Sequence, residues 1–124
     1  MIESAKVVIV AEDETPIRSL AVEILSDAGF EVIEASHAEE ALSALRSYTG
    51  TIHVLFTDIQ MPGAMNGLAL AHHVRSHWPW VALLITTGGE KPQAAELPEA
   101  SRFLGKPYHS DCMLTHIREL AATA

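Results

Sequence analysis

The chain has 124 residues, of which 48% are hydrophobic and 19% charged, and its formal net charge is −8. This length and balance fit a single globular domain over 1–124 with a sizeable core, and they exclude an intrinsically disordered chain. The acidic balance argues against direct nucleic-acid binding, which relies on Lys and Arg side chains that neutralise phosphates.

The chain contains one cysteine, Cys112, so a disulfide framework and a cysteine-based zinc site are both excluded. A reducing compartment fits this cysteine usage. No run of 18 or more apolar residues appears, and the first residues do not read as a signal peptide. We therefore expect a cytoplasmic protein without membrane insertion.

The predicted elements alternate between strand and helix. Short apolar runs rich in β-branched residues predict strands that are buried on both faces. Apolar residues that recur every three or four positions predict helices with one buried face. In chain order, the pattern predicts a strand over 6–11, a helix over 15–28, a strand over 30–35, a helix over 38–48, a strand over 52–56, a helix over 68–77, a strand over 81–86, a strand over 102–104 and a helix over 110–121.

The stretch between the last two predicted strands is rich in helix breakers. Pro92 and Pro98 enclose only 93–97, so at most one or two helical turns fit between them. We therefore expect the fourth helix, which should lie between these strands, to be shortened or disordered.

This alternation is typical of an α/β fold. Parallel strands need crossover connections, and the helix that follows a strand supplies one. Such crossovers are right-handed, and we expect helices on both faces of one sheet. We predict a doubly wound, five-stranded parallel sheet in one domain, without internal repeat or linker.

Polar and charged residues lie where the predicted strands end. The first strand leads into Glu12 and Asp13, the third into Asp58, the fourth into Thr87 and the fifth into Lys106. Ligands of open parallel sheets bind at the carboxyl ends of the strands, so these side chains are expected to converge. Three neighbouring carboxylates repel one another and call for a cation, and oxygen-only ligands suit Mg2+. An ammonium and a hydroxyl beside such a metal suit a phosphoryl group.

In their order and spacing, these residues resemble the receiver domain of two-component response regulators, over essentially the whole chain. The matching features are Glu12-Asp13, Asp58 with Met61-Pro62 behind it, Thr87-Gly88 and Lys106-Pro107. The resemblance implies a flavodoxin-like fold with strand order 2-1-3-4-5 and a cis peptide bond into Pro107. It also implies a stand-alone signalling switch that catalyses only its own phosphorylation and dephosphorylation.

The resemblance assigns a metal site and a phosphoacceptor. Asp58 would be the nucleophile that accepts the phosphoryl group. The Mg2+ ligands would be Glu12, Asp13, Asp58 and the backbone carbonyl of Gln60.

The resemblance also assigns the residues that respond to phosphorylation. Thr87 and Lys106 would bind the phosphoryl oxygens, and Phe103 would be the aromatic switch residue that follows the movement of Thr87. From the residues alone, Thr86 competes with Thr87 for this role, and the glycine directly after Thr87 favours Thr87.

The partners follow from the same resemblance. The phosphodonor would be a phosphohistidine on a sensor histidine kinase or on a histidine phosphotransfer protein. The output would be contact with a downstream protein target or transfer along a phosphorelay, without direct nucleic-acid contact. A homodimer is compatible with the resemblance.

Two departures from the family pattern stand out. The loop 61–67 is one residue longer than the commonest form, and only 18 residues separate Thr87 from Lys106. Because that second stretch contains Gly88, Gly89 and two prolines, we expect 88–100 to be mobile until phosphorylation or partner binding orders it.

Other functions remain open from the residues. An aspartyl-phosphate phosphatase of the haloacid-dehalogenase type would need a second Asp two residues after Asp58, and Gln60 stands there. A receiver-like interaction module that is never phosphorylated would not need the acidic residues and Lys106 together. The pair His73 and His77 has metal-ligand spacing on a predicted helix, but the face they share reads as a solvated surface.

Overall fold

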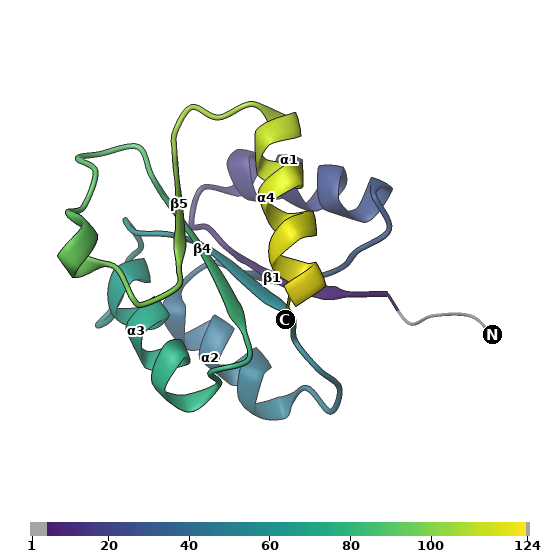
Figure 1. The fold of residues 1–124 in the computed structure, drawn as a ribbon, viewed down its shortest axis with the longest axis horizontal. Helices are drawn as coiled ribbons and strands as arrows, with labels where there is room; N and C mark the ends of the chain where they lie inside the picture. Colours follow the sequence, from purple (N-terminus) through teal and green to yellow (C-terminus); the bar gives the residue numbers. More distant parts are fainter. Residues whose placement is uncertain (1–4, 124) are drawn as a thin grey trace.

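The computed structural model describes residues 5–123 (Figure 1). Strands and helices alternate, except that a 3₁₀ helix takes the place of one α-helix. The elements are β1 (Val7–Ala11), α1 (Thr15–Asp27), β2 (Glu31–Ala35), α2 (Ala38–Ser47), β3 (Val54–Asp58), α3 (Gly67–His77), β4 (Ala82–Thr87), the 3₁₀ helix η1 (Ala94–Glu96), β5 (Arg102–Gly105) and α4 (Ser110–Thr123).

The five strands form one parallel sheet in the order β2-β1-β3-β4-β5, which confirms the predicted fold and strand order. β1 and β3 lie in the interior of the sheet, and every residue of both strands is buried. β2 lies at one edge of the sheet and is only partly buried.

Helices cover both faces of the sheet, with α1 and α4 on one face and α2 and α3 on the other (Figure 1). Alternate residues of each strand point to opposite faces, so the strands supply a separate core to each helix layer. The core under α1 and α4 contains Val8, Val10, Ala21, Leu25, Val54, Phe56, Leu84, Met113, Ile117, Leu120 and Ala121.

The third strand is displaced by two residues from its predicted position. The apolar pattern ends at Phe56, whereas the strand runs on to Asp58 because Thr57 and Asp58 continue the pairing with β4. The apolar pattern predicts only apolar buried residues, whereas the polar end of this strand is buried too: Thr57 is 0% exposed and Asp58 is 4% exposed.

The helix expected between β4 and β5 is reduced to the single turn of η1, which confirms the shortening. Gln93 and Glu96 cap this turn reciprocally, and the carbonyl of Glu96 lies 2.7 Å from Nε2 of His72 on α3. The segment is thus attached to the α2 and α3 face without a full helix. Its mobility stays a prediction.

Candidate functional site

Glu12 directly follows β1, and two hydrogen bonds to its backbone fix its position. Its N–H donates to the carbonyl of Ala35 at 2.9 Å, and its carbonyl accepts from Nη1 of Arg18 at 2.7 Å. The residue is 4% exposed, and its side chain accepts a hydrogen bond from the N–H of Glu14 at 3.2 Å. Asp13, the next residue, is exposed beside it.

Asp58 is the last residue of β3 and pairs with Thr86 of β4. The chain turns away directly behind it and returns at Gly67, whose N–H donates to the carbonyl of Ile59 at 2.9 Å. A Cβ at position 67 would lie 1.7 Å from the carbonyl oxygen of Asp58, so only glycine fits there. The start of α3 therefore packs directly against the backbone of Asp58.

Lys106 approaches the same carboxylates from the end of β5. Its Nζ lies 2.6 Å from Oε1 of Glu12 and 3.3 Å from Oδ2 of Asp58. Its N–H donates to the carbonyl of Thr87 at 3.0 Å, and the following peptide bond, into Pro107, is cis as expected. Beyond it, the ring of Tyr108 packs against Phe56 with the centroids 5.8 Å apart.

Burial sets the electrostatics of this cluster. Burial raises the pKa of the Asp58 carboxyl above its ordinary value, although the charge of Lys106 opposes the rise. Burial also raises the pKa of Glu12, and its hydrogen bond to Lys106 offsets this only in part. Burial alone would lower the pKa of Lys106, but the hydrogen bond to Glu12 and the charge of Asp58 together raise it. Burial therefore favours the neutral, protonated form of both carboxyl groups, and the two contacts keep the ammonium of Lys106 protonated.

The carboxylates are arranged as a cation site would require. Glu12, Asp13 and Asp58 each offer an oxygen, and these oxygens lie within 4.8 Å of one another. Oδ1 of Asp58 is buried and has no hydrogen-bond partner among residues 5–123. Three carboxylates face one ammonium, so a divalent cation would balance the charge, and an all-oxygen donor set suits Mg2+.

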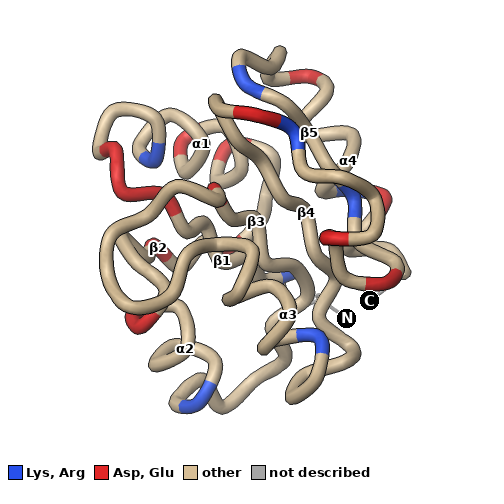
Figure 2. The backbone as a smooth tube through the Cα atoms, turned by 90° about the vertical axis from the view of Figure 1, so that its left-hand side faces the viewer, with Lys and Arg blue, Asp and Glu red and all other residues tan. Residues whose placement is uncertain are grey.

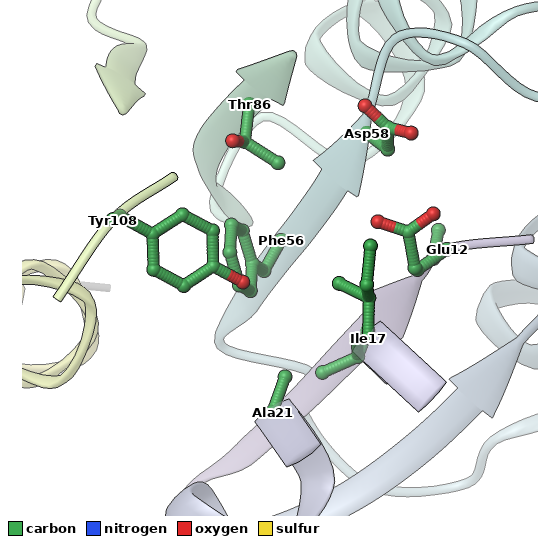
Figure 3. Close-up of a pocket in the computed structure, with 9 residues that line it drawn as sticks. Glu12, Ile17, Ala21, Phe56, Asp58, Thr86 and Tyr108 are labelled. Atoms are coloured by element: carbon green, nitrogen blue, oxygen red, sulfur yellow. The ribbon is translucent and has the colours of Figure 1, made fainter. Parts of the chain in front are cut away.

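The two threonines at the end of β4 point to opposite faces of the sheet. Thr86 shares a cavity of about 10 Å³ with Asp58, Glu12 and Tyr108 (Figure 3), and its hydroxyl has no hydrogen-bond partner within the described part of the chain. Thr87 instead donates from Oγ1 to Oε1 of Gln60 at 2.5 Å. The family resemblance implies a role only for the backbone carbonyl of Gln60, and the sequence carries no signal for this side-chain contact.

Phe103 lies on the α2 and α3 face of β5, partly buried against the core, with Nζ of Lys91 5.5 Å from its ring centroid. It is thus on the same face of the sheet as Thr87, whose neighbour across the strands is Gly105. The structure therefore brings Glu12, Asp13, Asp58 and Lys106 together, and it places Thr87, Gln60 and Phe103 beside them rather than in contact with the carboxylates.

An apolar groove of about 610 Å³ opens next to Lys106. One wall is α1, where Leu20 is 56% exposed, and the other is the connection from β5 to α4. Its lining residues are Pro16, Ile17, Leu20, Ala21, Ile24, Gly88, Lys106, Pro107, Tyr108 and Ser110.

Charge elsewhere is dispersed. Acidic positions are spread over several elements and outnumber the basic ones, as the net charge of −8 requires (Figure 2). Among the helices of residues 5–123, none is long and apolar enough to cross a membrane.

Comparison with known proteins agrees with this geometry. The sequence model of the response regulator receiver domain matches residues 8–118. The response regulator receiver protein CpdR of Brucella abortus is 27% identical, and the match covers 96% of this chain and 99% of that protein. The sensor kinase CckA of the same organism is 29% identical over 91% of this chain, and the DNA-binding transcriptional regulator NtrC of Salmonella typhimurium is 33% identical over 85%.

The matches span 12% of that kinase and 22% of that transcriptional regulator, so the chain corresponds to a small part of both relatives. Among solved structures, a response regulator receiver protein from Sinorhizobium medicae superposes with a TM-score of 0.88 at 26% identity, over 95% of each chain. Because the family model spans nearly all of the sequence and the fold agrees with it, the chain belongs to the response regulator receiver domain family of two-component signalling.

Proposed function

We propose that this chain is a phosphorylation-activated switch that accepts a phosphoryl group on Asp58. The observation that carries the proposal is the buried Oδ1 of Asp58, which has no partner within residues 5–123, in a cluster that also holds Lys106 and two further carboxylates. A carboxylate is a competent nucleophile for phosphoryl transfer, and the product is an acyl phosphate.

Glu12, Asp13, Asp58 and the backbone carbonyl of Gln60 would hold Mg2+. The ion would neutralise charge on the transferring phosphoryl oxygens. Two observations support this assignment: Oδ1 of Asp58 has no hydrogen-bond partner in the described part of the chain, and three carboxylates face one ammonium.

The transfer step needs positioning and charge neutralisation rather than a base. An oxygen of Asp58 attacks phosphorus, the P–N bond of the phosphohistidine breaks, and its electron pair stays on the imidazole nitrogen. The ammonium of Lys106, already 3.3 Å from Oδ2 of Asp58, would turn to the new phosphoryl oxygens. The hydroxyl of Thr87 would donate to one of them.

The donor would be a sensor histidine kinase or a histidine phosphotransfer protein. The groove between α1 and the β5–α4 connection supports a protein donor, since it offers an apolar docking surface with Lys106 at its edge. Phosphorylation adds roughly −1.5 to −2 charges. Thr87 would move toward the phosphoryl oxygens, and Phe103 would follow. This movement would change the surface that β4 and β5 present to a downstream protein target or a phosphorelay partner.

Labelling with acetyl phosphate tests the proposal. Intact-mass spectrometry should show one added phosphoryl group on the wild type in Mg2+, none in EDTA, and none on Asp58→Asn. An unlabelled wild type would contradict the proposal and favour an interaction module that is never phosphorylated. Multiple turnover of an organic phosphate ester would instead indicate a phosphatase.

A further inference from the structure

The hydroxyl of Thr87 is already engaged in the unphosphorylated protein. It donates from Oγ1 to Oε1 of Gln60 at 2.5 Å and accepts from the N–H of Gly89 at 3.0 Å. Thr87 is 2% exposed, whereas Gln60 lies at the surface. The contact joins the loop behind the phosphoacceptor to the end of β4.

A threonine hydroxyl has a single proton to donate. While that proton is shared with Gln60, it is not available to a phosphoryl oxygen on Asp58. The side chain of Gln60 and the phosphoryl group therefore compete for the same donor.

Gly89 leaves the space in which this contact forms. A Cβ at position 89 would lie 3.1 Å from Nε2 of Gln60 and 3.5 Å from Oγ1 of Thr87. A larger residue would need the Gln60 amide to shift by a few tenths of an ångström, whereas its distance from the Thr87 hydroxyl would be an ordinary van der Waals contact. The glycine, the glutamine and the threonine thus fit together as one local arrangement.

We propose that Gln60 is a positioning residue that holds Thr87 in its unphosphorylated orientation and so opposes the switch. The inference rests on the proposed function and adds to it a restraint from the Gln60 side chain, independent of its backbone carbonyl. A net hydrogen bond of ordinary strength corresponds to a two- to tenfold bias, to order of magnitude.

Binding of beryllofluoride, an analogue of the phosphoryl group, tests the proposal in Mg2+ by isothermal titration calorimetry. Gln60→Met keeps the length of the side chain and the backbone carbonyl but removes the amide acceptor. It should bind beryllofluoride about two- to tenfold more tightly than the wild type. Gln93→Met, at the only other glutamine in the chain, makes the same chemical change on η1 and should leave the affinity unchanged.

A double-mutant cycle separates the restraint from a packing effect. In a Thr87→Val background the hydroxyl is absent, so Gln60→Met should no longer tighten binding. An unchanged affinity in Gln60→Met, or an equal gain with and without the Thr87 hydroxyl, would overturn the restraint. A wild type that binds no beryllofluoride would contradict the proposed function itself.

The metal-free protein gives an independent readout. Three-bond couplings to the Thr87 methyl carbon should report one side-chain rotamer in the wild type and averaging over rotamers in Gln60→Met. A single rotamer in both proteins would also overturn the restraint, whatever the phosphorylation chemistry.

Discussion

Asp58→Asn should stabilise the protein when no divalent cation is bound. The charge interactions of Asp58 nearly cancel at an effective dielectric constant of 20: the attraction to Lys106 at 3.3 Å is worth about 5 kcal/mol, and the repulsion from Glu12, whose oxygen is within 4.8 Å, is at least about 3.5 kcal/mol. Asp13 is exposed, and solvent reduces its repulsion to about 1 kcal/mol.

Because the charge interactions nearly cancel, the cost of burying the carboxylate decides whether Asp58→Asn raises or lowers the free energy of unfolding. Oδ1 of Asp58 is buried without a hydrogen-bond partner within residues 5–123, and such a group costs about 1–3 kcal/mol, with charged groups at the upper end. Asparagine keeps a carbonyl oxygen but removes the charge, so the free energy of unfolding should rise by about 1–2 kcal/mol in EDTA.

In Mg2+, the wild type should be more stable than Asp58→Asn. At a concentration of one hundred times the dissociation constant, a bound ion stabilises the folded state by about 2.7 kcal/mol. The asparagine variant lacks one of the carboxylates that we propose to coordinate Mg2+. Urea denaturation of both proteins at pH 7.5, in EDTA and in Mg2+, measures the two differences. Asp27→Asn, at an exposed position on α1, is the control and should change stability by less than about 0.5 kcal/mol. Lower stability of Asp58→Asn in EDTA, or equal stabilisation of both proteins by Mg2+, would refute the reasoning.

Three further outcomes follow from the same contacts. Burial raises the pKa of Asp58 above 3.8 and of Glu12 above 4.5, so the folded state binds protons more readily than the unfolded state. The stability gained by Asp58→Asn in EDTA should therefore vanish below pH 3.8, where the Asp58 carboxyl is protonated in both the folded and the unfolded state. The gain should grow as pH rises through the raised pKa of Asp58 in the folded state. A gain that is constant from pH 3.5 to 7.5 would contradict this. The hydroxyl of Thr86 has no hydrogen-bond partner within residues 5–123, and Thr86→Val replaces it by a methyl group of similar shape. This variant should be about 1 kcal/mol more stable in urea denaturation, whereas a loss of stability would indicate that the hydroxyl has a partner. Gly67→Ala should destabilise by about 3 kcal/mol or more, because its Cβ would lie 1.7 Å from the Asp58 carbonyl oxygen, and a near-neutral change in thermal unfolding would show that α3 can shift away.

The sheet and its charged edge were predictable because they depend on patterns of residue type. Apolar runs identified the strands, and the charged residues directly behind them identified the edge where Glu12, Asp13, Asp58 and Lys106 meet. Two prolines were sufficient to predict that the connection from β4 to β5 holds no full helix.

Side-chain pairing was not predictable, since it depends on rotamers and on distances between segments that are far apart in sequence. At the start of α2, for example, the side chain of His37 accepts the hydrogen bond from the N–H of Glu40. The contact of Thr87 with Gln60 depends in the same way on a loop path behind β3 that no periodicity encodes. The close approach of Gly67 to Asp58 is likewise visible only when the chain is folded.

The ion pair of Lys106 with Glu12 joins two residues that are 94 positions apart. They follow β5 and β1, which are not neighbours, because β3 and β4 lie between them in the sheet. Contacts that close such long loops carry a large entropic cost, and they form only when the intervening chain is in place. A nascent chain that still lacks β5 thus has its acidic cluster but not the ammonium that balances it. The charge balance at Asp58 therefore depends on the pairing of β5 with β4, and an intermediate without that pairing leaves the acidic cluster without the ammonium of Lys106.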